Sequence, residues 1–188
     1  MRERLMDACI SSIQANGVVK TSIRDIATEA GIARQTVYKH FSNKNAILAA
    51  TFQREGMKFA AQVSAAIATS ADVEEQFVEG FLFVVENFSR NPILAEVVTP
   101  GSTFLIDVGM RHFSFAEFGI AVFQEVFTTD PRLAENAEAI SELWTRNALS
   151  FITMPGPERD REELRKFVRK FLIPCLGLGR LSEQLQTS

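Results

Sequence analysis

The stretch TSIRDIATEAGIARQTVYKHFSNK, residues 21–44, decides the fold. Ser22 can cap a helix whose third residue is Asp25. Apolar residues then recur on one helical face, at Ile23, Ile26, Ala27 and Ala30. A short helix is therefore predicted at 23–30. Gly31 supplies the positive φ that an abrupt helix end requires, so a second helix can begin within about three residues, as in a helix-turn-helix.

The second helix, predicted at 34–41, is short and polar. Val37 and Phe41 fall on one side, and the rest of the surface carries Gln35, Thr36, Lys39 and His40. Glutamine can bond a base edge through two hydrogen bonds, and lysine can bond a guanine edge or a phosphate. Tyr38 lies at the boundary, where its ring can pack while its hydroxyl reaches a phosphate. The alternative is an ordinary solvated helix face.

Another helix is predicted at 3–16, ended by Gly17, and it closes a three-helix core over the stretch described above. Arg2 and Arg4 stand at its start. They could reach into a minor groove as a short arm, or they could simply be solvated.

The order of residues in this region resembles the TetR family of bacterial transcriptional repressors. The family pattern is matched at Ser22, Ile26, Ala27, Ala30, Gly31, Ile32, Tyr38, His40, Phe41 and Lys44. The resemblance implies that Gln35, Thr36 and Lys39 face bases, whereas Tyr38, His40 and Lys44 hold phosphates. Thr21 and Arg34 complete the predicted DNA-binding set. Ala33 stands where the family often has a Ser or Thr cap, so the second helix is expected to start less firmly here.

Helical periodicity continues through the rest of the chain. Helices are predicted at 44–68, 73–89, 93–98, 131–153 and 160–182, with one or two more within 103–128 and a kink at Pro174. The expected fold is all-α with about nine helices. We expect a DNA-binding domain at 1–45 and a ligand-binding and dimerisation domain at 46–188, with helix 44–68 shared as the connector.

Composition bounds the class of protein. Of the 188 residues, 46% are apolar, but no run reaches the roughly eighteen apolar residues of a membrane span, and no signal peptide begins the chain. A cytoplasmic protein without membrane contact is expected. Cys9 and Cys175 are predicted to be small buried hydrophobes. Residues 1–55 hold eight Lys or Arg against five Asp or Glu, and the remainder twelve against eighteen, so only the head is basic.

The predicted second domain, residues 46–188, is rich in phenylalanine. Thirteen of the sixteen phenylalanines lie from Phe77 to Phe171. Such an interior suits an apolar or aromatic effector, although each ring alone is explained by plain core packing. The predicted ligand-binding residues are Phe81, Phe88, Phe104, Met110, Phe118 and Trp144. His112 and Glu117 could supply polar anchors, or could lie on the surface.

A ligand-responsive transcriptional regulator, most simply a repressor, is the predicted function. It would bind a palindromic operator in double-stranded DNA as a homodimer, paired through helices 131–153 and 160–182, as the resemblance implies. The alternatives are an all-α enzyme or small-molecule carrier with a structural head, and a DNA-binding head without ligand control. Because the sequence has no Glu-x-x-His pair, Gly-rich phosphate loop or His-x-x-x-His spacing, we expect no catalysis, cofactor or metal.

Overall fold

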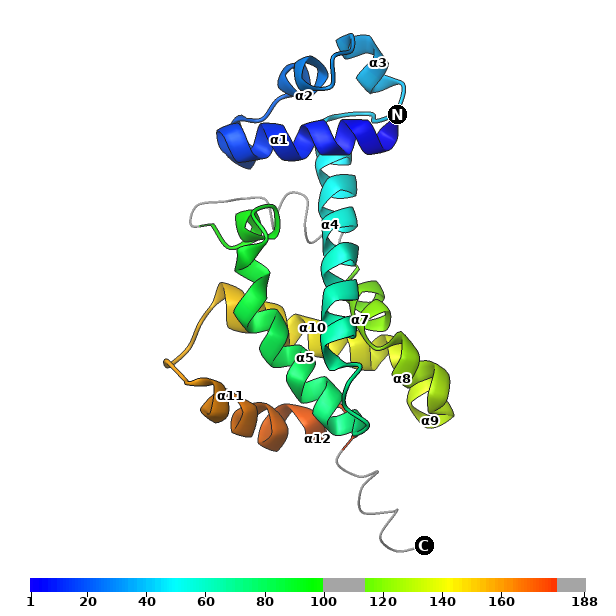
Figure 1. Ribbon diagram of the computed structural model, residues 1–188, viewed down its shortest axis with the longest axis vertical. Helices are drawn as coiled ribbons and strands as arrows, with labels where there is room; N and C mark the ends of the chain where they lie inside the picture. The colour runs from blue at the N-terminus through cyan, green and yellow to red at the C-terminus, as the bar shows by residue number, and fades with distance from the viewer. Residues whose placement is uncertain (100–113, 179–188) are drawn as a thin grey trace, which may run out of the picture. The chain divides into compact units, whose positions relative to one another are not determined.

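The computed structural model describes residues 1–99 and 114–178, and every regular element in these two ranges is a helix (Figure 1). The all-α class is therefore confirmed. The chain divides into two compact units, Met1–Gly56 with Ser89–Phe113 and Met57–Phe88 with Ser114–Ser188. Helix α4, Lys44–Ile67, is continuous from one unit into the other.

The first unit contains the helix-turn-helix. Helix α1 spans Arg2–Lys20, α2 spans Ile23–Glu29 and α3 spans Arg34–Tyr38. A capping box between Ser22 and Asp25 begins α2, and Gly31 takes a φ of 62° just after it ends. Apolar side chains from all three helices are buried, among them Leu5, Cys9, Ile26, Val37 and Phe41. The predicted three-helix core is present.

Two boundaries in this unit differ from prediction. Helix α1 does not end at Gly17 but resumes to Lys20, because the glycine adopts a φ of 74° and a ψ of 161° within the run. Helix α3 ends at Tyr38 rather than at Phe41. After α5, the chain returns to this unit through a 3₁₀ helix, η2, at Leu94–Val97.

The second unit holds the remaining helices. After the distal half of α4 come α5 (Val73–Asn87), followed by the 3₁₀ turn η1 (Phe88–Arg90), and then α7 (Phe115–Val122) and α8 (Gln124–Thr129). The next are α9 (Pro131–Ala134), α10 (Ala137–Thr153) and α11 (Arg161–Phe167). A π-helical turn, η4 (Val168–Leu172), and α12 (Ile173–Cys175) follow.

The prediction of one helix over 131–153 is wrong. Asp130 caps α9 and Pro131 is its first residue, as expected, but the helix stops after one turn. Asn136 then has a non-helical φ of −117° and begins α10. Periodicity missed this break because Leu133 and Ala137 keep the i, i+4 spacing across it.

The interior of the second unit is aromatic. Phe77 stacks on Phe123 with ring centroids 3.9 Å apart, and the Phe123 ring lies 4.9 Å from that of Trp144. The Trp144 indole donates a hydrogen bond of 3.1 Å to the Phe77 carbonyl, so its polar atom is satisfied. Gly80 permits this packing, because a Cβ there would meet Trp144 Cζ2 at 3.3 Å.

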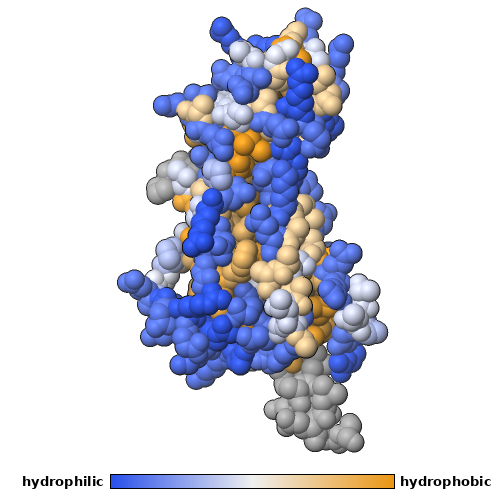
Figure 2. Space-filling view, viewed as in Figure 1, coloured by the Kyte–Doolittle hydropathy of each residue, from blue (hydrophilic) through white to orange (hydrophobic). Residues whose placement is uncertain are grey.

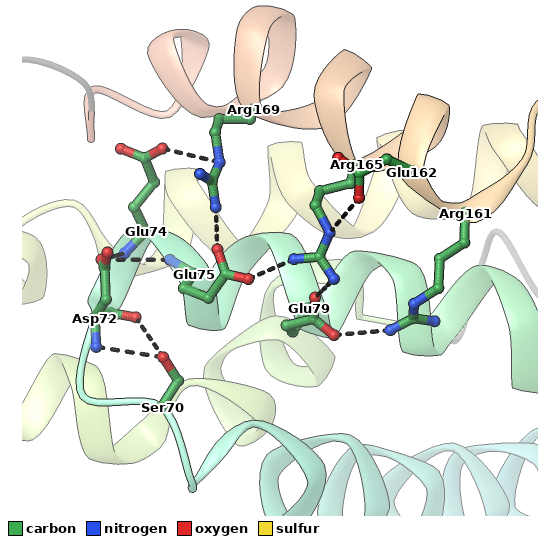
Figure 3. Close-up of polar contacts among 9 residues, drawn as sticks. All are labelled: Ser70, Asp72, Glu74, Glu75, Glu79, Arg161, Glu162, Arg165 and Arg169. Carbon is green, nitrogen blue, oxygen red and sulfur yellow. Dashed lines mark hydrogen bonds and ion pairs between the residues drawn. The ribbon is translucent and has the colours of Figure 1, made fainter.

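Helix α11 is held against α5 by ion pairs (Figure 3). Arg165 pairs with Glu75 and Glu79, and Arg161 also reaches Glu79 at 2.8 Å. Further pairs join Arg161 to Glu86 and Arg169 to Glu74 and Glu75. Three arginines at i, i+4 and i+8 thus place one face of α11 on the acidic face of α5. We call this set the arginine ladder; a network of this kind stabilises more than isolated surface pairs do.

Candidate nucleic-acid interface

The outer face of α3 carries the predicted base-reading residues. Val37 and Phe41 are buried, at 0% and 3% exposure, and they anchor the helix. Arg34, Gln35 and Lys39 are exposed, and Thr36 and His40 are half-buried. Gln35 and Lys39 are four residues apart and share one side of the helix. A donor and acceptor amide and a cation are therefore presented together, which suits recognition of base edges.

Tyr38 and Arg34 form a second pair on α3. Arg34 Nη2 donates to the Tyr38 hydroxyl at 2.9 Å, and the guanidinium carbon lies 5.5 Å from the ring centroid. Tyr38 is 44% exposed, so its hydroxyl is open to solvent on the outside of the head. A guanidinium and a phenol held together in this way can donate to one phosphate.

The N-terminus of α3 is weakly capped, as Ala33 predicts, because no side chain bonds its free amides. The head is secured from α1 instead. Arg2 Nη1 donates to the His40 carbonyl at 2.6 Å, and its guanidinium lies 4.1 Å above the Phe41 ring. Arg4 donates to the Ala30 carbonyl at the end of α2. Each arginine thus binds a carbonyl near a helix C-terminus, and both residues remain exposed.

Lys44 does not point freely outward, as a phosphate contact would require. Its ammonium donates to the carbonyls of Val18 and Val19 at 2.9 and 3.0 Å, beyond the Gly17 break in α1. Burial lowers the pKa of Lys44 from its ordinary value, although nearby Cys9 and Asp25 favour the charged form. This placement gives Lys44 a structural task, and its predicted phosphate contact is not supported by the geometry.

Thr21 is also placed differently from its predicted role. The side chain is 1% exposed, and both its hydroxyl and its amide donate to the Gly17 carbonyl, at 2.9 and 3.2 Å. A buried and fully bonded threonine cannot contact DNA in this conformation. The prediction for Thr21 is corrected accordingly: it closes the turn between α1 and α2.

Two acidic contacts complete the junction around α1. Glu96 of η2 accepts a hydrogen bond from the Val18 amide at 3.4 Å, the amide that the Gly17 break leaves without its helical acceptor. On the other side, Arg54 of α4 pairs with Glu3 and Asp7 of α1, both at 2.8 Å. Sequence reasoning missed these residues, because charges so distant in the chain reveal their pairing only when the helices cross.

Four of the six predicted effector residues lie in the described ranges, and they make two separate sets of ring contacts. Phe81 and Trp144, both 0% exposed, pack edge to face at 6.1 Å within the Phe77 cluster. Phe88 and Phe118 instead contact Phe59, at 5.9 and 6.3 Å. Phe104, Met110 and the candidate anchor His112 lie outside the described residues, and Glu117 is exposed. Among the described residues, Phe81 with Trp144 and Phe88 with Phe118 therefore belong to two ring groups.

The predicted dimer helices expose apolar side chains. Leu143 of α10 is 39% exposed, Met154 just after α10 is 73% exposed, and Phe171 of η4 is 53% exposed. On the face seen in Figure 2, hydrophilic residues predominate, with hydrophobic residues visible near α7 and α8. Cys9 is buried as predicted, whereas Cys175 is exposed, so the prediction of a buried Cys175 is wrong.

Two negative findings apply to residues 1–99 and 114–178. None of their helices combines the length and the apolar character needed to cross a bilayer. Nor does that part of the chain gather three or more His, Cys, Asp or Glu side chains in a metal-binding arrangement.

A three-helix head that displays a polar recognition helix defines a DNA-binding transcriptional regulator of the helix-turn-helix class. Residues 5–51 match the family model described as bacterial regulatory proteins, tetR family. Residues 5–51 therefore form a DNA-binding head of the tetR family.

Several known proteins are similar to this chain over most of its length and not only over the head. The HTH-type transcriptional repressor KstR of Mycolicibacterium smegmatis is 26% identical over 189 residues, covering 92% of this chain and 86% of KstR. The uncharacterized HTH-type transcriptional regulator Rv1255c of Mycobacterium tuberculosis strain H37Rv is 22% identical over 175 residues, covering 93% of this chain and 84% of that protein. The crystal structure of the TetR family repressor AlkX from Dietzia sp. strain DQ12-45-1b superposes with a TM-score of 0.68 at 22% identity, covering 94% and 95% of the two chains. That structure has the same fold.

Proposed function

We propose that this protein is a homodimeric repressor that binds a palindromic operator and is released by a small apolar or aromatic effector. The observation that carries the proposal is the outer face of α3, where Gln35 and Lys39 are exposed while Val37 and Phe41 anchor the helix. In this proposal, residues 1–45 form the DNA-binding domain and residues 46–188 bind the effector and the second subunit.

The proposed role of each residue on DNA follows from where its side chain lies in the head. Gln35, Thr36 and Lys39 read base edges, and Arg34, Tyr38 and His40 contact phosphates. Lys44 and Thr21 act indirectly, because their polar atoms hold the end of α1. Arg2 and Arg4 likewise position α3 and α2 through hydrogen bonds to the His40 and Ala30 carbonyls.

A dimer is needed because one short helix reads too few bases for operator specificity. Two recognition helices must lie roughly 34–36 Å apart to enter successive major grooves on one side of B-form DNA. The arginine ladder commits one face of α11 to α5, while Phe171 of η4 remains 53% exposed. That exposed apolar character on the last two helical segments supports pairing with a second copy.

In this proposal, the effector releases operator DNA by shifting the protein from one conformation to another. Helix α4 starts at Lys44 in the first unit and ends at Ile67 in the second, so a ligand that moves its distal half can change the head. A hundredfold loss of operator affinity requires about 2.7 kcal/mol of differential ligand binding, which one pocket can supply. The aromatic interior favours an apolar ligand body.

The test is a binding titration against a library of palindromic duplexes with varied half-sites and spacings. A repressor selects one half-site at one spacing, and an added effector weakens that complex. Equal binding to all duplexes would indicate a head without sequence selection. No binding to any duplex would contradict the proposal and favour the enzyme or carrier alternative.

A further inference from the structure

In the part of the second unit that the structure describes, two buried hydroxyl groups have no hydrogen-bond partner. Ser141 is 0% exposed and Thr145 is 5% exposed, and neither Oγ of Ser141 nor Oγ1 of Thr145 meets a donor or an acceptor. The two residues are one turn apart on α10, so their side chains lie on the same face. They flank Trp144, whose own polar atom is satisfied by the Phe77 carbonyl.

The missing bond of Thr145 is unusual within this chain. A helical threonine can satisfy its hydroxyl at the carbonyl four residues earlier. Thr51, Thr128, Thr129 and Thr153 all do so, at 2.7 to 2.9 Å. Thr145 has the Ser141 carbonyl available at the same spacing and does not donate to it. Its hydroxyl is therefore turned away from the helix backbone.

Solvent does not reach either oxygen in this conformation, and helix α7 packs closely against Ser141. Gly119 of α7 lies so close to Ser141 that a Cβ on the glycine would fall 2.6 Å from the Ser141 Cβ. Two other buried polar atoms lack an ideal hydrogen bond, Arg54 Nη2 and Glu79 Oε1, but each faces an opposite charge. Within the described ranges, only the two α10 hydroxyls have neither kind of partner.

Buried polar groups without partners destabilise a fold, so such groups point to a ligand or to another conformation that satisfies them. We propose that the hydroxyls of Ser141 and Thr145 are the polar recognition point of the effector site. Both can donate, and two donors one turn apart can converge on one oxygen. The effector is accordingly an apolar molecule that carries a carbonyl, carboxyl or hydroxyl oxygen, not a plain hydrocarbon. This inference rests on the proposed effector-controlled function.

The first test concerns the protein without ligand. Thr145→Val keeps the shape of the side chain and removes an unsatisfied group, so the thermal unfolding midpoint should rise by about 2–4 °C. Thr51→Val is the matched control: Thr51 is also 0% exposed, but its hydroxyl donates to Ile47 at 2.8 Å, so its midpoint should fall. A fall for Thr145→Val equal to that of the control would overturn the proposal.

The second test uses four probes of equal chain length: decane, 1-decanol, 2-decanone and decanoate. The unfolding midpoint of the wild type should rise more with an oxygen-bearing probe than with decane. Thr145→Ser should keep that difference, and the double variant Ser141→Ala with Thr145→Val should lose it. If decane shifts the wild type as much as the other three probes, or if no probe shifts it, the assignment is wrong.

Operator binding measured with the same probes separates the two hypotheses. If the protein selects an operator and all four probes release it equally, the repressor proposal stands and only the oxygen-recognition assignment fails. If the protein selects no operator, the proposed function itself fails, whatever the midpoints show.

Discussion

At the scale of single residues, the head is organised by side chains that bind backbone carbonyls. Arg2, Arg4 and Lys44 each donate to a carbonyl at or beyond the end of a helix. A cation at a helix C-terminus is favoured by the partial negative charge of the unpaired carbonyls. These three basic residues therefore hold the helices of the head, whereas Arg34 and Lys39 are exposed on the recognition-helix side.

This division predicts different consequences for substitutions on α3. Gln35→Ala should relax base preference at one position and cost about 1–3 kcal/mol on the cognate duplex only. Tyr38→Phe removes the proposed phosphate contact and should weaken cognate and random duplexes by similar factors. Fluorescence anisotropy titrations with both duplexes measure the two ratios. Equal losses on both duplexes for Gln35→Ala would contradict its role in reading bases.

Cys9 predicts a pH dependence of stability. Burial raises the pKa of its thiol to about 11, against hydrogen bonding from Thr51 and the charges of Lys44 and Arg54, which lower it. A raised pKa stabilises the fold below the unfolded pKa, and that stability is lost as pH rises through the folded value. Between about pH 9 and 11 the free energy of unfolding should fall by about 1.4 kcal/mol per pH unit from this group.

The control is Cys9→Ala, because the other alkaline groups titrate in both proteins. Urea unfolding at several pH values gives the difference between wild type and variant. The difference in the free energy of unfolding between wild type and Cys9→Ala should decrease above pH 9. A constant difference from pH 8 to 11 would show that the thiol does not resist ionisation in the fold.

At the scale of elements, ion pairs join α11 to α5 along one face. The arginine ladder predicts that charges can be exchanged across it. Arg165→Glu alone faces Glu75 and Glu79 and should destabilise the second unit, and Glu75→Arg alone faces Arg165 and Arg169 (Figure 3). The double variant should recover about 1 kcal/mol relative to the sum of the singles, since each residue is only about a quarter exposed.

Lys166→Glu provides the matched control for that cycle. It reverses a charge on the same helix, but Lys166 is 74% exposed and pairs at 3.9 Å only with Glu162 of α11 itself. Its effect on the urea midpoint should be within about 0.5 kcal/mol of zero. If the stability effects of Arg165→Glu and Glu75→Arg simply add in the double variant, the arginine ladder does not position α11.

At the scale of the whole molecule, the prediction concerns assembly. Phe171→Asp puts a charge on an exposed apolar position of the last helical segments and should convert the proposed dimer to a monomer, with loss of cooperative operator binding. Ile120→Asp is the control, since Ile120 is 37% exposed on α7, outside the proposed dimer helices. Analytical ultracentrifugation checks both. A Phe171→Asp protein that sediments like the wild type would refute this interface.

Much of the fold could be read from local signals in the sequence. Three predicted helix boundaries are present in the structure: the Ser22 and Asp25 cap, the turn at Gly31, and the start at Asp130 and Pro131. They could be predicted because caps and positive φ are properties of a few adjacent residues. The division of α3 into a buried side and an exposed polar side also follows from the spacing of its residues alone. Breaks such as Asn136 were missed because periodicity continues across them.

The sequence by itself determined the all-α class, the helix-turn-helix and the exposed face of α3, since these depend on neighbours within one or two turns. Only the tertiary structure decided that Lys44, Thr21, Arg2 and Arg4 bind carbonyls. It also showed that the four described effector candidates belong to two ring groups and that, among the described residues, Ser141 and Thr145 lack a hydrogen-bond partner. The physical reason is range: a hydrogen bond or ring contact between distant segments depends on how helices cross, and side-chain periodicity carries no information about that crossing.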